Sequence, residues 1–319
     1  MRESCKIRSV QQAMRIGVDV GGTKIEAIAL DVRGAELQRI RTATPKGDYA
    51  GTIATIVGLV HELETVTQQT GTVGVGIPGT IVGTTGLVKN ANSTWLNGKP
   101  LQRDLSAALN REVRCANDAN CFAISEATDG AAQGYEVVFG VIFGTGCGGG
   151  VSIAGRIHNG PNGLGGEWGH TPLPWATAAE TPGMLCYCGH HGCLEMWISG
   201  TGLEWDFART SSRNLRGTEI VQAAKAGDEE AKEALDRLID RMARGLSTVV
   251  NVLDPDAIVV GGGLSNLERL YDGELAARLR DYGFGGGVQT PILRNVHGDS
   301  SGVRGAAWLW PLQKGDAGE

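Results

Sequence analysis

Several features are missing from this sequence, and each absence excludes a class of protein. No apolar stretch approaches the roughly 20 residues that a membrane helix needs, and the first residues lead into no apolar signal core. We therefore expect a cytoplasmic protein that does not act at a membrane. Basic residues are not in excess either, because 29 Lys and Arg stand against 35 Asp and Glu. No surface for nucleic acid is predicted.

Glycine, in contrast, is abundant, with 49 of the 319 residues, about twice the usual share of roughly 7%. No Gly-X-Y period appears, which excludes collagen. The glycines gather instead at Gly21-Gly22, at 144–150 and at 261–263, each cluster beside an apolar, β-branched run. This pattern predicts strands that end in glycine turns rather than a flexible linker.

Hydrophobic periodicity predicts an α/β protein with mixed sheets. We expect strands at 15–20, 25–31, 36–44, 72–77, 112–116, 137–143, 151–157 and 257–260. We expect helices at 48–68, 101–110, 119–132, 194–209, 218–226, 229–253 and 301–312. Each half of the chain contains a strand, a glycine turn and a second strand, which suggests a duplicated fold whose halves face each other across a cleft.

The length of 319 residues predicts two domains. We place an N-terminal α/β domain at 14–130, joined by the last helix at about 300–313. A larger C-terminal α/β domain then covers 131–299 and contains a loop at 170–193 that is rich in cysteine and histidine. Residues 1–13 show no period and form an extension.

The segment Asp19-Val20-Gly21-Gly22-Thr23-Lys24 is a candidate phosphate site. Glycines let backbone N–H groups approach phosphate oxygens, Thr23 adds a hydroxyl, Lys24 adds a positive charge, and Asp19 can hold Mg²⁺ through water. The alternative is an ordinary hairpin turn with an exposed lysine. The segment is not a Walker A loop, because G-x-x-x-x-G-K-[ST] occurs nowhere in the chain.

Two other glycine clusters require a structural context before they can be interpreted. The segment 144–149 and the segment 74–79 both match G-x-G-x-x-G, but a dinucleotide fingerprint must open a helix. Neither does so, and we keep Gly144-Thr145-Gly146 as a second phosphate-binding hairpin. At the third cluster a strand runs into Gly262 and Gly263, where a flat ring can pack against backbone amides, although many α/β proteins contain such a turn.

Three of the seven cysteines, Cys186, Cys188 and Cys193, lie within eight residues. In a reducing compartment this spacing predicts metal ligation rather than disulfides, and thiolates favour zinc with four tetrahedral ligands. The fourth ligand can be His170, His190 or His191. A site closed by four protein ligands is structural, and three free cysteines are the alternative.

Two further motifs offer polar groups for chemistry. Asn117-Asp118 follows a predicted strand and opens a helix, so Asp118 is either a helix cap or a functional carboxylate. Glu167 and His170 lie three residues apart and can together grip vicinal hydroxyls. A surface glutamate beside a metal ligand is the alternative for Glu167.

Taken in this order, the motifs resemble those of the ROK family of sugar kinases and sugar-responsive repressors. The resemblance runs from about Met14 to Pro311. It implies a two-domain, actin/hexokinase-like (ribonuclease H-like) α/β fold with mixed sheets and an interdomain cleft. The segments Asn90 to Gly98 and His297 to Trp308 look like those of the bacterial fructokinase, or manno(fructo)kinase, branch.

The resemblance also implies roles for these residues. Asp118 is the catalytic base that accepts the proton of the sugar's 6-hydroxyl as it attacks the γ-phosphate of ATP. The sugar is bound by Gly79, Asn92, Asn117, Glu167, His170 and Glu195. ATP is bound by Asp19, Gly21, Gly22, Thr23, Lys24, Gly144, Thr145, Gly146, Gly262 and Gly263. Zinc is held by His170, Cys186, Cys188 and Cys193, so that the metal fixes the sugar-binding loop.

The sequence therefore predicts an ATP-dependent kinase that uses Mg²⁺, contains a structural Zn²⁺ and converts D-fructose to fructose 6-phosphate, with mannose as a further substrate. Glucokinase and N-acetylhexosamine kinase are the alternatives within the family. A sugar-sensing regulator is a third, but it needs a DNA-binding module, and only 13 residues precede Met14. The partners that we expect are sugar, ATP and a second copy of the chain in a homodimer.

Overall fold

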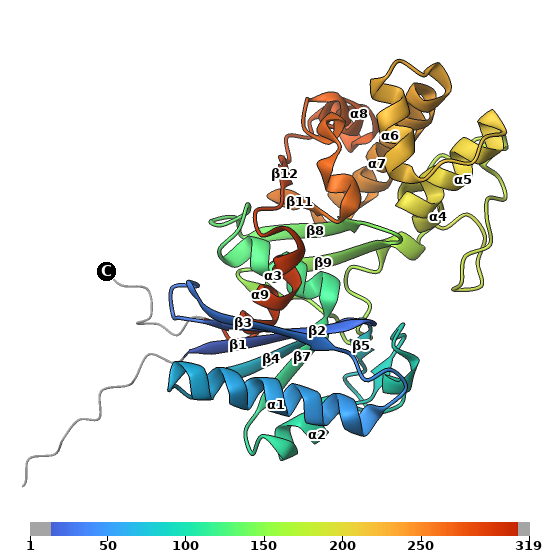
Figure 1. Ribbon diagram of the computed structural model, residues 1–319. Helices are drawn as coiled ribbons and strands as arrows, with labels where there is room; N and C mark the ends of the chain where they lie inside the picture. The colour runs from blue at the N-terminus through green and yellow to red at the C-terminus, as the bar shows by residue number, and fades with distance from the viewer. Residues whose placement is uncertain (1–13, 312–319) are drawn as a thin grey trace, which may run out of the picture. The chain divides into compact units, whose positions relative to one another are not determined.

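The computed structural model describes residues 14–311, except for the side chain of Asp299, and divides the chain into two compact units (Figure 1). The N-terminal unit contains the described residues up to Asp118 and from Val303 onward. The C-terminal unit runs from Ala119 to Gly302. The extension predicted at 1–13 and the end of the last predicted helix lie outside the described residues.

The N-terminal unit is built on a five-stranded mixed sheet in the order β3-β2-β1-β4-β7. Its strands are β1 (Arg15–Val20), β2 (Lys24–Leu30), β3 (Glu36–Ala43), β4 (Thr72–Ile77) and β7 (Val113–Asn117). Strand β1 pairs antiparallel with β2 and parallel with β4. A small hairpin, β5 (Thr80–Ile81) and β6 (Val88–Lys89), and the 3-10 turn η1 (Thr94–Leu96) follow β4.

Helices cover both faces of this sheet. Helices α1 (Tyr49–Thr67) and α2 (Leu101–Ala108) lie against one face (Figure 1), and the Asp48 carboxylate caps α1 by accepting from the Gly51 amide at 2.9 Å. The helix α9 (Ser301–Ala307), which belongs to this unit from Val303 onward, lies on the other face (Figure 1). A Cβ at Gly17 would collide with the carbonyl of Val303, and one at Gly74 with that of Ala306. Glycine is thus required where α9 meets β1 and β4.

The C-terminal unit repeats this sheet, with the order β10-β9-β8-β11-β12. Its strands are β8 (Val137–Phe143), β9 (Cys147–Ile153), β10 (Arg156–Ile157), β11 (Ala257–Gly261) and β12 (Ile292–Arg294). Strand β8 pairs antiparallel with β9 and parallel with β11, as β1 does with β2 and β4. The duplicated layout expected from the two glycine turns is present in the strand order and directions.

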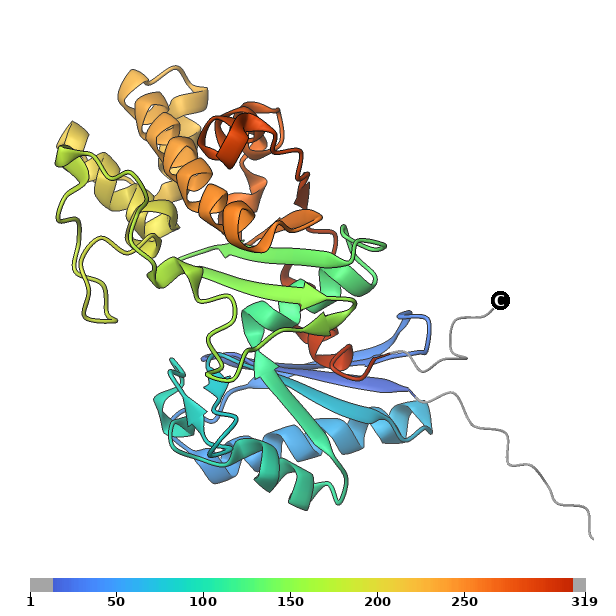
Figure 2. The ribbon, with the colours of Figure 1, turned by 180° about the vertical axis from the view of Figure 1, so that it is seen from behind.

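The helices of the C-terminal unit lie mainly on one face of its sheet (Figure 2). They are α4 (Glu195–Ile198), α5 (Gly200–Ser211), α6 (Gly217–Lys225), α7 (Glu229–Leu253) and α8 (Glu274–Tyr282). Short 3-10 turns connect the strands and helices of this unit: η2 (Trp168–His170), η3 (Ala178–Glu180), η4 (Gly263–Asn266), η5 (Glu268–Leu270), η6 (Phe284–Gly286) and η7 (Gly298–Ser300). Alternate residues of β8 divide between two cores, with Phe139 and Phe143 toward these helices and Val138 toward α3 (Asp118–Thr128).

Several predicted boundaries differ from the structure. The predicted domain boundary at residue 130 places α3 in the first domain, whereas the structure groups α3 from Ala119 onward with the C-terminal unit. The physical reason is close packing, because a Cβ at Gly140 would collide with Ala123 and one at Gly150 with the backbone of Ala119. The second domain boundary falls between Gly302 and Val303, inside α9.

Three predicted elements also change. The cluster 144–150 is not all turn, because β9 begins at Cys147 and its glycines pair with β8. The helix predicted at 194–209 is broken at Ser199, whose extended backbone ends α4 and whose Oγ caps α5 by accepting from the Gly202 amide at 3.0 Å. The last helix ends at Ala307 rather than at residue 312. Among residues 14–311, none of the helices has the length and apolar character that crossing a bilayer requires.

Candidate functional site

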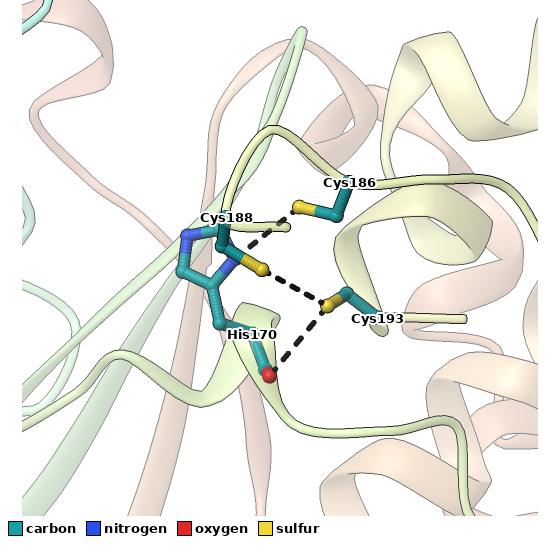
Figure 3. A group of neighbouring side chains, drawn as sticks. All are labelled: His170, Cys186, Cys188 and Cys193. Carbon is teal, nitrogen blue, oxygen red and sulfur yellow. Dashed lines mark hydrogen bonds between the residues drawn. The ribbon is translucent and has the colours of Figure 1, made fainter. Parts of the chain in front are cut away.

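Four predicted metal ligands come together in the C-terminal unit (Figure 3). The ligand atoms of His170, Cys186, Cys188 and Cys193 all lie within 4.8 Å of one another. The Sγ of Cys186 is 3.5 Å from Nδ1 of His170, and the Sγ of Cys188 is 3.5 Å from the Sγ of Cys193. The turn η2 supplies the histidine, and the segment that leads into α4 supplies the cysteines.

The donor set suits a zinc ion, and the two separations of 3.5 Å match a tetrahedral site. With Zn–S near 2.3 Å and Zn–N near 2.0 Å, neighbouring ligand atoms in a tetrahedron are about 3.5–3.8 Å apart. Burial raises the pKa of the Cys186 and Cys193 thiols, that of Cys193 to about 12. Holding these groups as thiolates therefore requires a cation, and a thiol-rich set with one imidazole favours zinc.

The other two histidines of the loop are placed differently. The Nδ1 of His191 is 3.1 Å from the carbonyl oxygen of Gly183. The Nδ1 of His190 is 3.7 Å from the Sγ of Cys188, but within the described part of the chain His190 is not in the group of four. The geometry therefore favours His170 as the fourth ligand.

The loop between His170 and Cys186 is anchored to α7 by buried charges. Glu180 accepts from Nε of Arg241 at 2.8 Å and from both terminal nitrogens of Arg244 at 2.8 and 3.0 Å. Although burial raises the pKa of Glu180, hydrogen bonds led by Arg244 lower it to about 2. Arg244 also donates to the carbonyl of Trp175 at 3.1 Å. The two arginines and the Glu180 carboxylate therefore hold in place the loop that joins the proposed metal ligands.

The candidate sugar residues of this unit lie at the two ends of the metal-binding segment. Glu195 opens α4, and its Oε2 accepts from the Cys147 amide at 2.9 Å. Burial raises the pKa of Glu167, the charge of His170 lowers it and that of Glu195 raises it, which shows that the three groups interact. The Nε2 of His170, on the side of the ring away from Cys186, is 2.8 Å from Oη of Tyr187.

The turn between β8 and β9 is held from outside. The Gly144 carbonyl accepts from the Gly200 amide at 2.8 Å, and the Thr145 carbonyl accepts from Oγ1 of Thr201 at 2.8 Å. A Cβ at Gly144 would meet nothing, whereas one at Gly146 would collide with the Glu195 carboxylate. Of the two predicted glycines here, Gly144 has open space where a side chain would lie, although its amide and carbonyl are both hydrogen-bonded, and Gly146 makes room for the Glu195 carboxylate.

The third glycine turn also contains one glycine with close neighbours and one with open space beside it. Gly262 has a φ of +80°, and a Cβ there would meet the carbonyl of Phe143 at 2.5 Å. Gly263 opens η4, and a Cβ there would meet nothing within 4 Å. The backbone at Gly263 is therefore the more open of the two to a flat ring.

In the N-terminal unit, the turn between β1 and β2 contains the first predicted phosphate site. The Gly21 amide donates to the Lys24 carbonyl at 3.0 Å, and Oγ1 of Thr44 donates to the Gly21 carbonyl at 2.7 Å. A Cβ at Gly22 would meet nothing, and Thr23 is exposed. The turn is a tight hairpin whose tip is exposed. This geometry is compatible with a phosphate-binding site and also with an ordinary hairpin turn.

Asp19 and Asp118 interact within this unit. Strands β1 and β7 flank β4, and Gly76 of β4 pairs with Asp19 on one side and with Ala116 on the other. Burial raises the pKa of Asp19 to about 7, with further contributions from Asp118 and Glu26. Asn117 ends β7 and Asp118 opens α3, as the sequence indicated.

The remaining predicted sugar residues lie beside the small hairpin of this unit. The Gly79 amide donates to the Ile77 carbonyl at 2.9 Å, and a Cβ at Gly79 would meet Ala91 at 2.8 Å. The Asn92 amide donates to the Pro78 carbonyl at 3.1 Å, and its side chain is exposed. The structure thus brings Gly79 and Asn92 together, although they are 13 positions apart in sequence.

Sequence reasoning missed two groups of polar residues. Tyr187 contacts His170, and Glu26 accepts from Nη1 of Arg39 at 2.7 Å and from Nε of Arg41 at 2.8 Å. Alternation at 39 and 41 on β3 marks a shared face, and Arg41 pairs in register with Glu26. From that alternation, the two arginines could have been predicted to lie on one face of the sheet.

Comparisons with known proteins agree with these motifs. Residues 15–313 match the model of the ROK family. An N-acetyl-D-glucosamine kinase of Pectobacterium atrosepticum is 41% identical over 307 residues, which cover 93% of this chain and 98% of the relative. The chain therefore belongs to the ROK family, as one of its sugar kinases.

Two solved structures are similar over nearly the whole chain. The ROK hexokinase from Thermus thermophilus has a TM-score of 0.83 and 32% identity, with 93% of this chain and 97% of the other covered. A ROK family glucokinase from Streptomyces griseus, solved with glucose and AMPPNP, has a TM-score of 0.73 and 29% identity, with 92% and 98% covered. The predicted hexokinase-like α/β fold is confirmed, whereas the predicted fructokinase branch is not.

Proposed function

We propose that this protein transfers the γ-phosphate of ATP to the 6-hydroxyl of N-acetyl-D-glucosamine. The choice of substrate rests on the 41% identity to an N-acetyl-D-glucosamine kinase over 93% of the chain. This was an alternative at the level of sequence, where fructose came first. Fructose, with mannose, is the second candidate because of the segments Asn90 to Gly98 and His297 to Trp308.

Asp118 acts as the catalytic base in this proposal. It accepts the proton of the 6-hydroxyl, the sugar oxygen forms a bond to the γ-phosphorus, and the bond to the β,γ-bridging oxygen breaks, which releases ADP. Mg²⁺, when bound, neutralises charge on the phosphates. Asp19 would hold this ion through water, and its position supports the role, because burial and the charges of Asp118 and Glu26 raise the pKa of Asp19 to about 7.

The proposal assigns sugar-binding and nucleotide-binding residues in each unit. Asn117, Gly79 and Asn92 of the N-terminal unit, and Glu167, His170 and Glu195 of the C-terminal unit, bind the sugar. The turns at Gly21 to Lys24 and at Gly144 to Gly146 bind the phosphates through backbone amides. The backbone at Gly262 and Gly263 packs against adenine.

Zinc would have a structural role with a functional consequence. His170, Cys186, Cys188 and Cys193 would hold the ion, and the 3.5 Å separations between their donor atoms support this set. Ligation at Nδ1 orients the imidazole so that Nε2 is available to the sugar. The expected homodimer, the cytoplasmic location and the cleft between the units remain predictions.

A coupled assay of ADP release tests the proposal. The protein receives Mg-ATP and, in separate reactions, N-acetyl-D-glucosamine, fructose, mannose and glucose. We expect the highest kcat/KM with N-acetyl-D-glucosamine. A higher kcat/KM for fructose would reverse the choice of substrate, and no turnover with any hexose would overturn the proposed kinase activity.

A further inference from the structure

Tyr187 lies between two of the proposed zinc ligands and contacts a candidate sugar residue. Its Oη is 2.8 Å from Nε2 of His170, and the two rings meet edge to face with centroids 5.0 Å apart. The hydroxyl of Tyr187 therefore contacts one of the residues that we propose to hold the sugar.

The backbone of Tyr187 is fixed, whereas most of its side chain is not. The Gly189 amide donates to the Cys186 carbonyl at 2.9 Å and the Cys186 amide donates to the His190 carbonyl at 2.8 Å, which closes a turn around Tyr187. The residue is nevertheless 80% exposed. Because little packs against the ring, rotation about its side-chain bonds can move the hydroxyl away from His170 without disturbing the loop.

Only one partner can use Nε2 of His170 at a time. Each imidazole nitrogen offers a single position in the plane of the ring, either an N–H or a lone pair. With Nδ1 directed at the cysteine cluster, 3.5 Å from the Sγ of Cys186, a metal on Nδ1 leaves the proton on Nε2. That N–H can donate to Tyr187 Oη or to a sugar oxygen, but not to both in good geometry.

We propose that Tyr187 is a specificity-determining residue of the sugar site, whose phenol hydroxyl occupies Nε2 of His170 until a sugar hydroxyl replaces it. The inference rests on the proposed sugar kinase function and on the role of His170 in sugar binding. Two consequences follow. The hydroxyl competes with the sugar and lowers its affinity, and the bulk of the ring limits which substituent fits beside the sugar oxygen that His170 binds.

The variant Tyr187→Phe tests the competition, because it keeps the ring and removes Oη. Calorimetric titration without ATP gives the Kd of each of the four sugars, so this result does not depend on turnover. A net hydrogen bond of ordinary strength predicts a Kd for sugar that falls about 2- to 10-fold. In the assay, the fall in sugar KM should exceed any change in kcat or in the KM for ATP. An unchanged or raised sugar Kd would overturn the proposal.

Tyr135→Phe is the matched control, because Tyr135 also lies in the C-terminal unit and is 39% exposed, but at a different part of the chain, in the turn before β8. It should leave sugar Kd and KM unchanged. A fall equal to that of Tyr187→Phe would mean that the effect does not come from the hydroxyl at His170, and the proposal would fail.

The variant Tyr187→Ala tests selectivity, because it removes the ring as well. We expect the ratio of kcat/KM for N-acetyl-D-glucosamine to that for glucose to change at least threefold, while in Tyr187→Phe this ratio stays within about twofold. An unchanged ratio in Tyr187→Ala would show that the ring sets no specificity. If the unaltered protein binds sugars but phosphorylates none, the proposed function fails while the titrations still decide the role of Tyr187.

Discussion

The two units contain the same hairpin but use it for different chemistry. In the N-terminal unit, the turn from β1 to β2 projects its tip at Gly22, and Asp19, Glu26 and Asp118 interact behind it. In the C-terminal unit, the turn from β8 to β9 is tied to α5 through the Gly144 carbonyl, and the Glu195 carboxylate lies against it. The comparison indicates that a duplicated scaffold fixes where the turns lie, whereas side chains from neighbouring segments decide what each turn can bind.

The buried carboxylates of the two units also differ in the side chains that surround them. The pKa of Asp19 is raised to about 7, mainly by burial and then by neighbouring acids. The pKa of Glu180 is lowered to about 2, because hydrogen bonds from Arg244 and Arg241 outweigh its burial. Asp19 is therefore poised to receive a cation, whereas Glu180 already has its cations and serves the scaffold. Each prediction below tests one side of this contrast, beginning with the largest expected effect.

The largest effect should come from Asp118→Asn in the N-terminal unit. Loss of a general base costs about 10²- to 10⁴-fold, and kcat should fall by that factor while the calorimetric Kd of the sugar changes little. Asp281→Asn, at an exposed position of α8, is the control and should keep full activity. Comparable activity of Asp118→Asn and the unaltered protein would mean that Asp118 only caps α3.

Glu180→Ala should give the next largest effect, on stability rather than on chemistry. Removing the carboxylate takes away the buried partner that Arg241 and Arg244 share and leaves them only Asp206 and Asp240. We expect a loss of about 3 kcal/mol in the free energy of unfolding. Urea unfolding measures this loss. Because its pKa is lowered, the contribution of Glu180 is complete above pH 4.5 and is lost as the pH falls toward 2. The difference in the free energy of unfolding between the variant and the unaltered protein should therefore shrink as the pH falls from 4.5 to 2.

Glu26→Ala is the matched variant of the N-terminal unit. Its partner Arg41 is 49% exposed and can find water instead, so we expect a smaller loss of about 1 kcal/mol. Equal losses in Glu26→Ala and Glu180→Ala would remove the distinction between a partly solvated ion pair and a buried one.

How far the sequence determined these features depends on the distance between interacting residues. The hairpin turns and the cysteine spacing are local patterns, and His170 was recognised through its family motif. The partners of Glu26 lie 13 and 15 positions away on another strand, and Tyr187 meets His170 across 17 positions of irregular loop. Helical and strand periods carry no information about such contacts. Similarly, the helix break at Ser199 required knowledge of what α4 and α5 pack against.

Asp19→Asn should stabilise the protein while removing its function. In the unfolded chain the carboxyl has a pKa of 3.8, and in the folded chain about 7, so folding favours the protonated form and stability falls as the pH rises between these values. At about 1.4 kcal/mol per pKa unit, the variant should gain about 2–4 kcal/mol at pH 8 without Mg²⁺ and nothing at pH 3. Thermal unfolding at both values measures this gain. A variant that is no more stable than the unaltered protein at pH 8 would show that Asp19 is not strained by its neighbours.

The last prediction concerns the cysteine cluster, whose loss should affect the binding of sugar more than the binding of ATP. Cys188→Ser should reduce bound zinc from one ion per chain, measured by elemental analysis, and weaken sugar binding about 10- to 100-fold because His170 loses its orientation. The Kd of ATP should change less, since the hairpin at Gly21 to Lys24 does not depend on the metal. His190→Ala is the control and should retain zinc, because His190 is not in the group of four ligands. Equal weakening of sugar and ATP would instead mean that the metal supports the whole fold, and loss of zinc from His190→Ala would make His190 the fourth ligand.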